Sequence, residues 1–217
     1  MYSNKCIIQI GSHVGNTPND PIFNIIDHTT KLIVVEPVPY LFHQLVKNYS
    51  SRFDNSNIVF INKAVSNYVG EIELTIPSER NDFSNLYPYA SQLSSVNPYH
   101  VKAHFPNLLV ETIKVPATTI DAILDEYAIR EIDVLHTDTE GHDYTILMNY
   151  SFRIKPLLVL FEHTHMDGIF TVGKNYEELS DRLISLGYVK MWQKEEDTLF
   201  RLNVIPCNVP SPSPGPS

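Results

Sequence analysis

Short apolar runs alternate with helix-like stretches along most of the chain. Most of these runs are rich in Ile, Leu and Val, as buried strands are, whereas GEIELTI alternates like a half-exposed strand. Strands are predicted at residues 6–10, 31–36, 57–65, 70–76, 131–137, 156–162, 188–193 and 197–202. The last two are separated by the short polar segment KEE and therefore predict a hairpin.

Between the strands, apolar residues recur at helical spacing. Helices are predicted at residues 20–28, from Pro39 onward, at residues 120–127 and at residues 175–187. Thr119 and Asn175 are the expected N-caps of the last two, and Gly187 ends the final helix. Repeated strand–helix–strand units imply parallel strands with helices on both faces of the sheet. We therefore expect an α/β, Rossmann-like fold with a seven-stranded, mostly parallel sheet and an antiparallel last strand.

The composition fits one folded domain. The chain has 217 residues, of which 43% are hydrophobic, enough for one substantial core. We expect a single domain over residues 1–205, followed by a disordered Pro- and Ser-rich tail at residues 206–217. Residues 77–110 are long for an unstructured connection, so they predict either a lid or substrate loop or an added packing element. Aromatic side chains that suit a hydroxylated acceptor occur in this segment at Phe83, Tyr87, Tyr89 and Tyr99.

Charge and cysteine content exclude several classes of function. The formal net charge of -9, with scattered Lys and Arg, argues against nucleic-acid or anionic membrane partners. Cys6 and Cys207 indicate neither a disulfide framework nor a zinc site. No apolar run approaches the ~18 residues of a membrane span, and the first residues lack a signal-peptide hydrophobic region. We therefore expect a soluble, cytoplasmic protein.

The turn after the first strand indicates the kind of ligand. Gly11 and Gly15 have a G-x-x-x-G spacing, without the middle glycine that packs against a pyrophosphate in nicotinamide sites. Glu36 ends the second strand, where a carboxylate can accept hydrogen bonds from both hydroxyls of a ribose. Together with the closing hairpin, these features favour S-adenosylmethionine as the ligand.

An acidic segment follows the strand predicted at residues 131–137. Because that strand should neighbour the glycine-turn strand, the carboxylate of Asp138 is expected to project into the crevice between them. Asp138 can orient an acceptor hydroxyl or take its proton. Glu140 can do either, or can hold the turn at Gly141 by bonding backbone amides. His142 and Asp143 are expected at a helix start.

From about residue 7 to about residue 202 the chain resembles the FkbM-type methyltransferases. The most specific segment is IDVLHTDTEGHDYTIL, in which Asp138, Glu140, Gly141 and Asp143 match the family's pattern. The resemblance implies the class I methyltransferase fold, S-adenosylmethionine as cofactor and S-adenosylhomocysteine as product. It also implies O-methylation of a hydroxyl group on a sugar, glycan or related small molecule.

The expected site residues lie in these turns. The cofactor-binding candidates are Gly11, Ser12, His13, Gly15, Glu36, Pro37, Ala64, Val65 and Asp138, with Ala64 and Val65 near the adenine. Asp138, Glu140 and His163 are the catalytic candidates, and no metal is assigned. The sequence departs from the family's pattern at Gln9, where an acid is usual, at His13, where asparagine is usual, and at His136, where lysine is common.

Two alternatives stay open. Glu162 and His163 leave the neighbouring strand, and with Asp138 they can bind a divalent cation, as in metal-dependent O-methyltransferases. His165 is expected at the same rim of the cleft. If no metal binds, this rim is a polar surface on which a histidine acts as a base or donates a hydrogen bond to the substrate. The second alternative is a non-catalytic nucleoside-binding module on the same fold, which would tolerate loss of Asp138 and Glu140.

Overall fold

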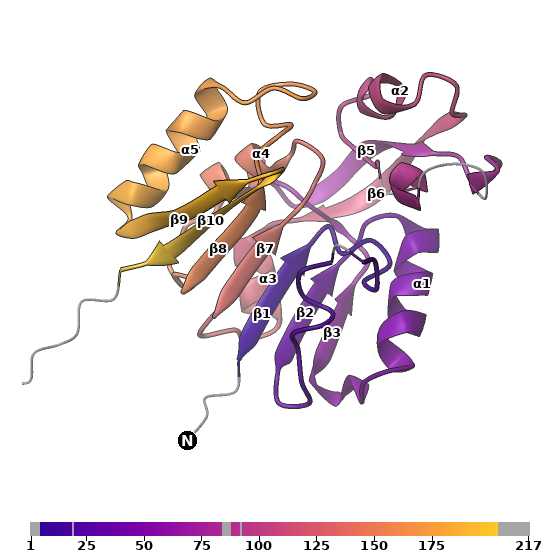
Figure 1. Cartoon of the computed structure of the whole chain (residues 1–217). Coiled ribbons are helices and arrows are strands. Elements are labelled where there is room, and N and C mark those ends of the chain that lie inside the picture. Colours follow the sequence, from indigo (N-terminus) through magenta and orange to yellow (C-terminus); the bar gives the residue numbers. More distant parts are fainter. Residues whose placement is uncertain (1–4, 19, 84–87, 92, 204–217) are drawn as a thin grey trace, which may run out of the picture.

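A seven-stranded sheet forms the centre of the structure, a computed structural model that describes residues 5–18, 20–83, 88–91 and 93–203. Its strands are β1 (Cys6–Ile10), β2 (Lys31–Val35), β3 (Ile58–Ile61), β7 (Val134–Thr137), β8 (Leu158–Glu162), β9 (Tyr188–Lys194) and β10 (Asp197–Leu202). They are ordered β3-β2-β1-β7-β8-β10-β9 (Figure 1). Strands β3, β2, β1, β7 and β8 are parallel to one another, and β10 runs antiparallel to β8 and β9. The predicted mostly parallel sheet with an antiparallel last strand is confirmed.

A second sheet of three strands lies beside the first and was only partly predicted. It contains β4 (Ala64–Val65), β5 (Gly70–Pro77) and β6 (Val110–Thr118), in the order β4-β6-β5. The strand predicted at residues 57–65 is divided, because the Asn62 side chain bonds the Glu36 carbonyl at 2.8 Å and the chain then enters the second sheet. The sequence pattern does not predict β6, since charged residues such as Lys114 interrupt it; Lys114 instead pairs across the strands with Glu73 at 3.7 Å.

Five α-helices accompany the sheets in the described residues: α1 (Pro39–Ser50), α2 (His100–His104), α3 (Ile120–Glu126), α4 (Asp143–Asn149) and α5 (Lys174–Ser185). The Thr119 hydroxyl caps α3 by accepting from the Ala122 amide at 3.0 Å, as predicted. Gly173, not Asn175, is the N-cap of α5, because the Asp167 carboxylate accepts from the first amides of that helix. Within the described part of the chain, no helix is long and apolar enough to cross a membrane.

Residues 20–28 do not form the predicted helix. The segment makes consecutive turns, in which the Asp20 carboxylate accepts from the Ile22 and Phe23 amides, both at 2.7 Å. A second local turn follows, where the Thr30 amide bonds the Asp27 carbonyl at 3.2 Å. Local side-chain bonds of Asp thus compete with the helical pattern, while Ile22 and Ile26 are still buried against the sheet.

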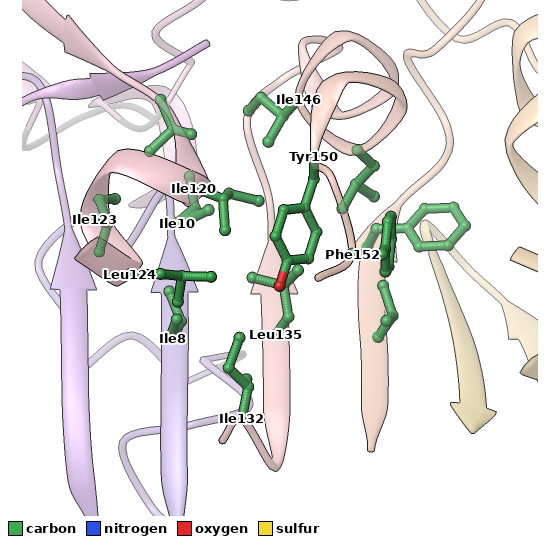
Figure 2. Packing of buried hydrophobic residues seen from close by; sticks show 14 of the residues in the cluster. Ile8, Ile10, Ile120, Ile123, Leu124, Ile132, Leu135, Ile146, Tyr150 and Phe152 are labelled. Carbon is green, nitrogen blue, oxygen red and sulfur yellow. The ribbon is translucent and has the colours of Figure 1, made fainter. Parts of the chain in front are cut away.

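The central strands β1, β2, β7 and β8 bury both of their faces, which explains their apolar sequences. Ile8 and Ile10 of β1 point to the face covered by α3, α4 and α5, where they join the largest core cluster (Figure 2). Ile7 points to the opposite face, where it packs with Leu45 and Tyr49 of α1. Such alternation is the ordinary geometry of a strand in a sheet that is covered on both sides.

Residues 77–110 contain structure of their own. They include the short 3-10 helix η3 (Pro88–Ser91) and α2, and they bury a small apolar cluster of Ala90, Leu93, Val101 and Leu108. Ser95 exchanges two backbone hydrogen bonds with Thr75 of β5, at 2.9 and 3.1 Å. The segment is therefore fastened to the second sheet. Tyr99 is 74% exposed, while Tyr87 and the side chain of Tyr89 lie outside the described residues.

Candidate functional site

The turn after β1 brings the ends of β1, β2 and β7 together. Gly11 has a positive φ of 79°, and its amide donates to the Val35 carbonyl at 3.0 Å. A Cβ at Gly11 would lie 1.7 Å from the backbone oxygen of Asp138. Only glycine permits this approach between the turns that follow β1 and β7.

The second glycine of the motif has a packing role. A Cβ at Gly15 would lie 2.4 Å from the Tyr49 ring of α1. Ser12 is also committed to the fold, since its buried hydroxyl donates to the Gln9 carbonyl at 3.1 Å and accepts from the Val35 amide at 3.2 Å. Neither Gly15 nor Ser12 lines the cavity that opens at these strand ends.

The other expected cofactor-binding residues all line that cavity: Gly11, His13, Glu36, Pro37, Ala64, Val65 and Asp138. The sequence did not point to the rest of the wall, which includes Lys63, Ile72, Leu74, Ser94, Val96, Thr139 and His142. Ile72 and Leu74 lie on the half-exposed strand β5, whose alternation signalled that one face packs against something. Ser94 and Val96 lie in the 77–110 segment, where no periodic pattern marks them.

Glu36 holds the walls of the cavity. Its carboxylate accepts from the His13 amide at 2.9 Å and from the Val38 amide at 2.8 Å, one bond to each oxygen. The residue is 4% exposed, and burial raises its pKa to about 7. Because a carboxylate oxygen has two lone pairs, each oxygen can accept a further bond from a ligand.

His13 is a polar group in the wall without a partner. Both ring nitrogens are buried and have no hydrogen-bond partner among the described residues. Burial lowers the pKa of His13 to about 4, so the ring is neutral and offers one donor and one acceptor. A buried polar group that is left unpaired is unfavourable, which points to a ligand that completes it.

Carboxylates concentrate where β7 and β8 end. The Asp138 side chain is exposed to the cavity, but protein surrounds the cavity on its other sides. Desolvation raises the pKa of Asp138 well above its usual range, and repulsion from the Glu140 and Asp143 carboxylates raises it further. No ion pair or hydrogen bond of the Asp138 carboxylate occurs in the described part of the chain. Asp143, the first residue of α4, is buried and instead holds the preceding turn, because it accepts from the Thr139 amide and hydroxyl at 3.1 and 2.7 Å.

Glu140 lies between the cavity and a group of histidines. It has a positive φ of 53°, and its carbonyl accepts from the Ser95 hydroxyl at 2.8 Å. Its Oε2 atom is 2.6 Å from Nε2 of the buried His100. Desolvation raises the pKa of Glu140 to about 8 and lowers that of His100 to about 4, so both favour their neutral forms. The sequence did not single out His100.

His163 does not join Asp138 and Glu140. Its ring Nδ1 lies 3.1 Å from the Thr198 hydroxyl of β10, and its ring packs 5.4 Å from that of Tyr176. Glu162 lies next to His165, at 3.4 Å between Oε1 and Nε2. Within the described residues, the cation site expected from Asp138, Glu162 and His163 is therefore not assembled.

The chemistry of the wall fits S-adenosylmethionine. Glu36 offers acceptor positions for ribose hydroxyls, and the unpaired nitrogens of His13 offer further bonds. Ile72 and Leu74 supply apolar surface for a planar base. Asp138 supplies a carboxyl group without a cationic partner among the described residues, and a positively charged sulfonium beside it would favour its charged form.

Comparison with known proteins gives a consistent picture. The sequence matches the family model described as the methyltransferase FkbM domain over residues 9–190. No curated protein matches the chain in sequence. The fold is similar to that of the methyltransferase FkbM from Methylobacillus flagellatus KT, at 12% identity and a TM-score of 0.54, over 92% of this chain and 43% of that one. The chain thus spans less than half the length of that protein.

A second solved structure has a similar arrangement. It is the fibrillarin of Aeropyrum pernix in complex with natively bound S-adenosyl-L-methionine, at 13% identity and a TM-score of 0.49, over 92% of this chain and 67% of that one. At 12% identity, the similarity to the Methylobacillus flagellatus protein concerns the fold alone.

Proposed function

The chain belongs to the FkbM methyltransferase family, and on that premise we propose that it transfers the methyl group of S-adenosylmethionine to a hydroxyl group of a sugar, a glycan or a related small molecule. The family match supports cofactor use and methyl transfer. The hydroxyl acceptor and the roles of individual residues are the proposal, argued below from the wall of the cavity.

The cofactor side of the proposal rests on Glu36 and His13. When bound, S-adenosylmethionine supplies an electrophilic methyl carbon on a positively charged sulfur. Glu36 would accept from the ribose hydroxyls while it keeps its bonds to the His13 and Val38 amides. His13 would complete its two ring nitrogens, and Ala64 and Val65 would contact the adenine. These contacts orient the donor, which accounts for much of the rate gain available in a displacement reaction.

The observation that carries the acceptor proposal is the carboxylate of Asp138. It follows the strand next to the glycine turn, and its amide is held to the Ile10 carbonyl at 3.0 Å. A hydroxyl group that attacks a methyl carbon must lose its proton, and Asp138 lines the cavity with no partner among the described residues to compete for that proton. Its raised pKa makes the Asp138 carboxylate a stronger base than an ordinary aspartate.

The polar part of the wall supports a hydroxylated acceptor. Ser94, Thr139 and His142 line the same cavity as Asp138 and offer hydroxyl and imidazole groups. His142 is held by the Ser66 hydroxyl, 3.0 Å from its Nε2. Several donors and acceptors on one wall match the repeated hydroxyl groups of a sugar better than an apolar acceptor. Glu140 would bond the acceptor or position the turn.

Asp138→Asn tests the proposal. Methyl transfer would be measured with isotopically labelled S-adenosylmethionine on a panel of sugars, glycans, phenols and amines, and the labelled product would be assigned by NMR. We expect an O-methyl product, and a variant that retains cofactor affinity but turns over roughly 10²–10⁴-fold more slowly. Asp181→Asn, an exposed position on α5, is the matched control. A product that carries the labelled methyl group on nitrogen or carbon would contradict the proposal, and so would normal turnover by the Asp138→Asn variant.

A further inference from the structure

Three histidines and one carboxylate meet beside the cavity, on its Glu140 side. His100 and His104 are one turn apart on α2, His165 follows β8, and Glu140 follows β7. One candidate ligand atom from each residue lies within 4.8 Å of all the others. We propose that these four residues bind a divalent transition-metal ion of the zinc type.

The donor set determines the class of ion. Three imidazole nitrogens with one carboxylate oxygen suit Zn²⁺ and similar first-row ions, whereas Mg²⁺ and Ca²⁺ prefer oxygen ligands. Zinc bonds of about 2.0–2.2 Å place tetrahedral ligand atoms about 3.4 Å apart. Oε2 of Glu140 is already 2.6 Å from Nε2 of His100 and 3.9 Å from Nε2 of His165. Small side-chain movements would therefore complete the tetrahedron.

The contacts within and around the cluster also favour ion binding. The rings of His100, His104 and His165 contact one another, with centroids 4.6 to 5.2 Å apart. The His104 Nε2 atom is buried and has no hydrogen-bond partner in the described part of the chain, so it is a free ligand position. The Phe170 ring covers the cluster, 4.5 Å from the His104 ring and 5.1 Å from the His165 ring. His100 and His165 are buried, so two of the four ligand residues are shielded from solvent before an ion binds.

His165 must change tautomer to take part. In this structure the Phe170 amide donates to its Nδ1 at 3.1 Å, so the ring proton is on Nε2, facing Glu162 and Glu140. An ion bound at Nε2 requires the proton on Nδ1, and the Phe170 amide then loses its acceptor. The short contact between His100 and Glu140 is likewise replaced by two bonds to the ion. Ion binding would therefore change the turn around Phe170.

A site with four protein ligands has no open position, which is typical of structural zinc. The ion would connect α2, and with it the 77–110 segment, to the turns that follow β7 and β8. Since Glu140 also lines the cavity, the ion would fix one wall of the acceptor region. The inference does not depend on methyl transfer, because ion binding is measured directly.

The test uses the full chain without a histidine tag, stripped by dialysis against a chelator and titrated with Co²⁺ and then with Zn²⁺. We expect one ion per chain, the intense visible absorption of four-coordinate Co²⁺, and a higher melting temperature with Zn²⁺. His104→Ala should weaken binding by at least about 100-fold, more than the loss of a residue that only supports a ligand. His104 is suitable because its Nε2 has no bond to lose in the described structure.

His43→Ala is the matched control, since His43 is exposed on α1 and distant from the cluster in sequence. It should bind Co²⁺ as the unaltered chain does, and circular dichroism would verify that each variant is folded. If His104→Ala does not fold, His100→Ala replaces it. Uptake of no ion by the unaltered chain, or equal binding by the cluster variant and His43→Ala, would overturn the proposal whatever the methyltransferase activity.

Discussion

Glu36 is expected to serve both the stability of the fold and the affinity for the cofactor, and two substitutions separate these roles. Glu36→Ala removes the acceptor of the His13 and Val38 amides, which lie 2.9 and 2.8 Å from the carboxylate. Each amide left without an acceptor costs about 1–3 kcal/mol, so the variant should lose about 2–6 kcal/mol of unfolding free energy. Glu36→Gln keeps one acceptor oxygen and should lose about half as much.

The cofactor affinity should fall in both variants. Loss of an acceptor for the ribose hydroxyls is worth about 1–3 kcal/mol, which corresponds to a Kd increase of roughly 5- to 150-fold. Isothermal titration with S-adenosylhomocysteine gives the Kd, and urea unfolding gives the stability of the same preparations. Glu73→Ala is the control, because Glu73 is exposed on β5 and should change stability by less than about 0.5 kcal/mol.

The two measurements refute different parts of the reasoning. An unchanged Kd in a folded Glu36→Ala protein would remove Glu36 from the ligand site. Unchanged stability would show that other groups or water satisfy the His13 and Val38 amides. Equal losses in the Ala and Gln variants would contradict the idea that one remaining oxygen is useful.

Three further outcomes are expected. Gly11→Ala should destabilise the fold by about 2–5 kcal/mol, because the new Cβ would lie 1.7 Å from the Asp138 backbone oxygen and the residue has a positive φ. Gly70→Ala, at an exposed site, is the control and should have little effect, so equal urea midpoints for the two variants would contradict this reasoning. Thr119→Ala should remove the α3 cap and about 1 kcal/mol of stability, and an unchanged melting temperature would count against the cap. Burial raises the pKa of Glu36 from 4.5 to about 7, so the folded state keeps a proton that the unfolded state releases. Stability should therefore fall as pH rises through that window, and melting temperatures of Glu36→Gln should lack this component.

The sequence predicted the parts of the fold that follow from local patterns of apolar residues. The apolar runs around Ile8 and Leu135 predicted buried parallel strands, since a sheet covered on both faces needs them. Glu36 and Asp138 could then be placed at one edge, because parallel strands end there. The residues at those ends line a single cavity.

Contacts between distant segments could not be predicted in the same way. His100 and Glu140 are 40 positions apart, and no periodic pattern connects the 77–110 segment to the turn after β7. The sequence also did not indicate which of His163 and His165 faces the site. Beyond Glu162 the chain leaves the strand, so strand alternation no longer indicates which histidine faces the site; the structure directs His165 toward Glu140 and His163 toward Thr198.

The central claim is that S-adenosylmethionine binds where β1, β2 and β7 end, with its sulfur toward the acids. A crystal structure of the chain with S-adenosylhomocysteine tests this most directly. We predict that the adenine lies near Val65, the ribose hydroxyls bond the Glu36 carboxylate, and the sulfur faces Asp138. A product molecule bound at another site, or one whose ribose has no contact with Glu36, would contradict the account.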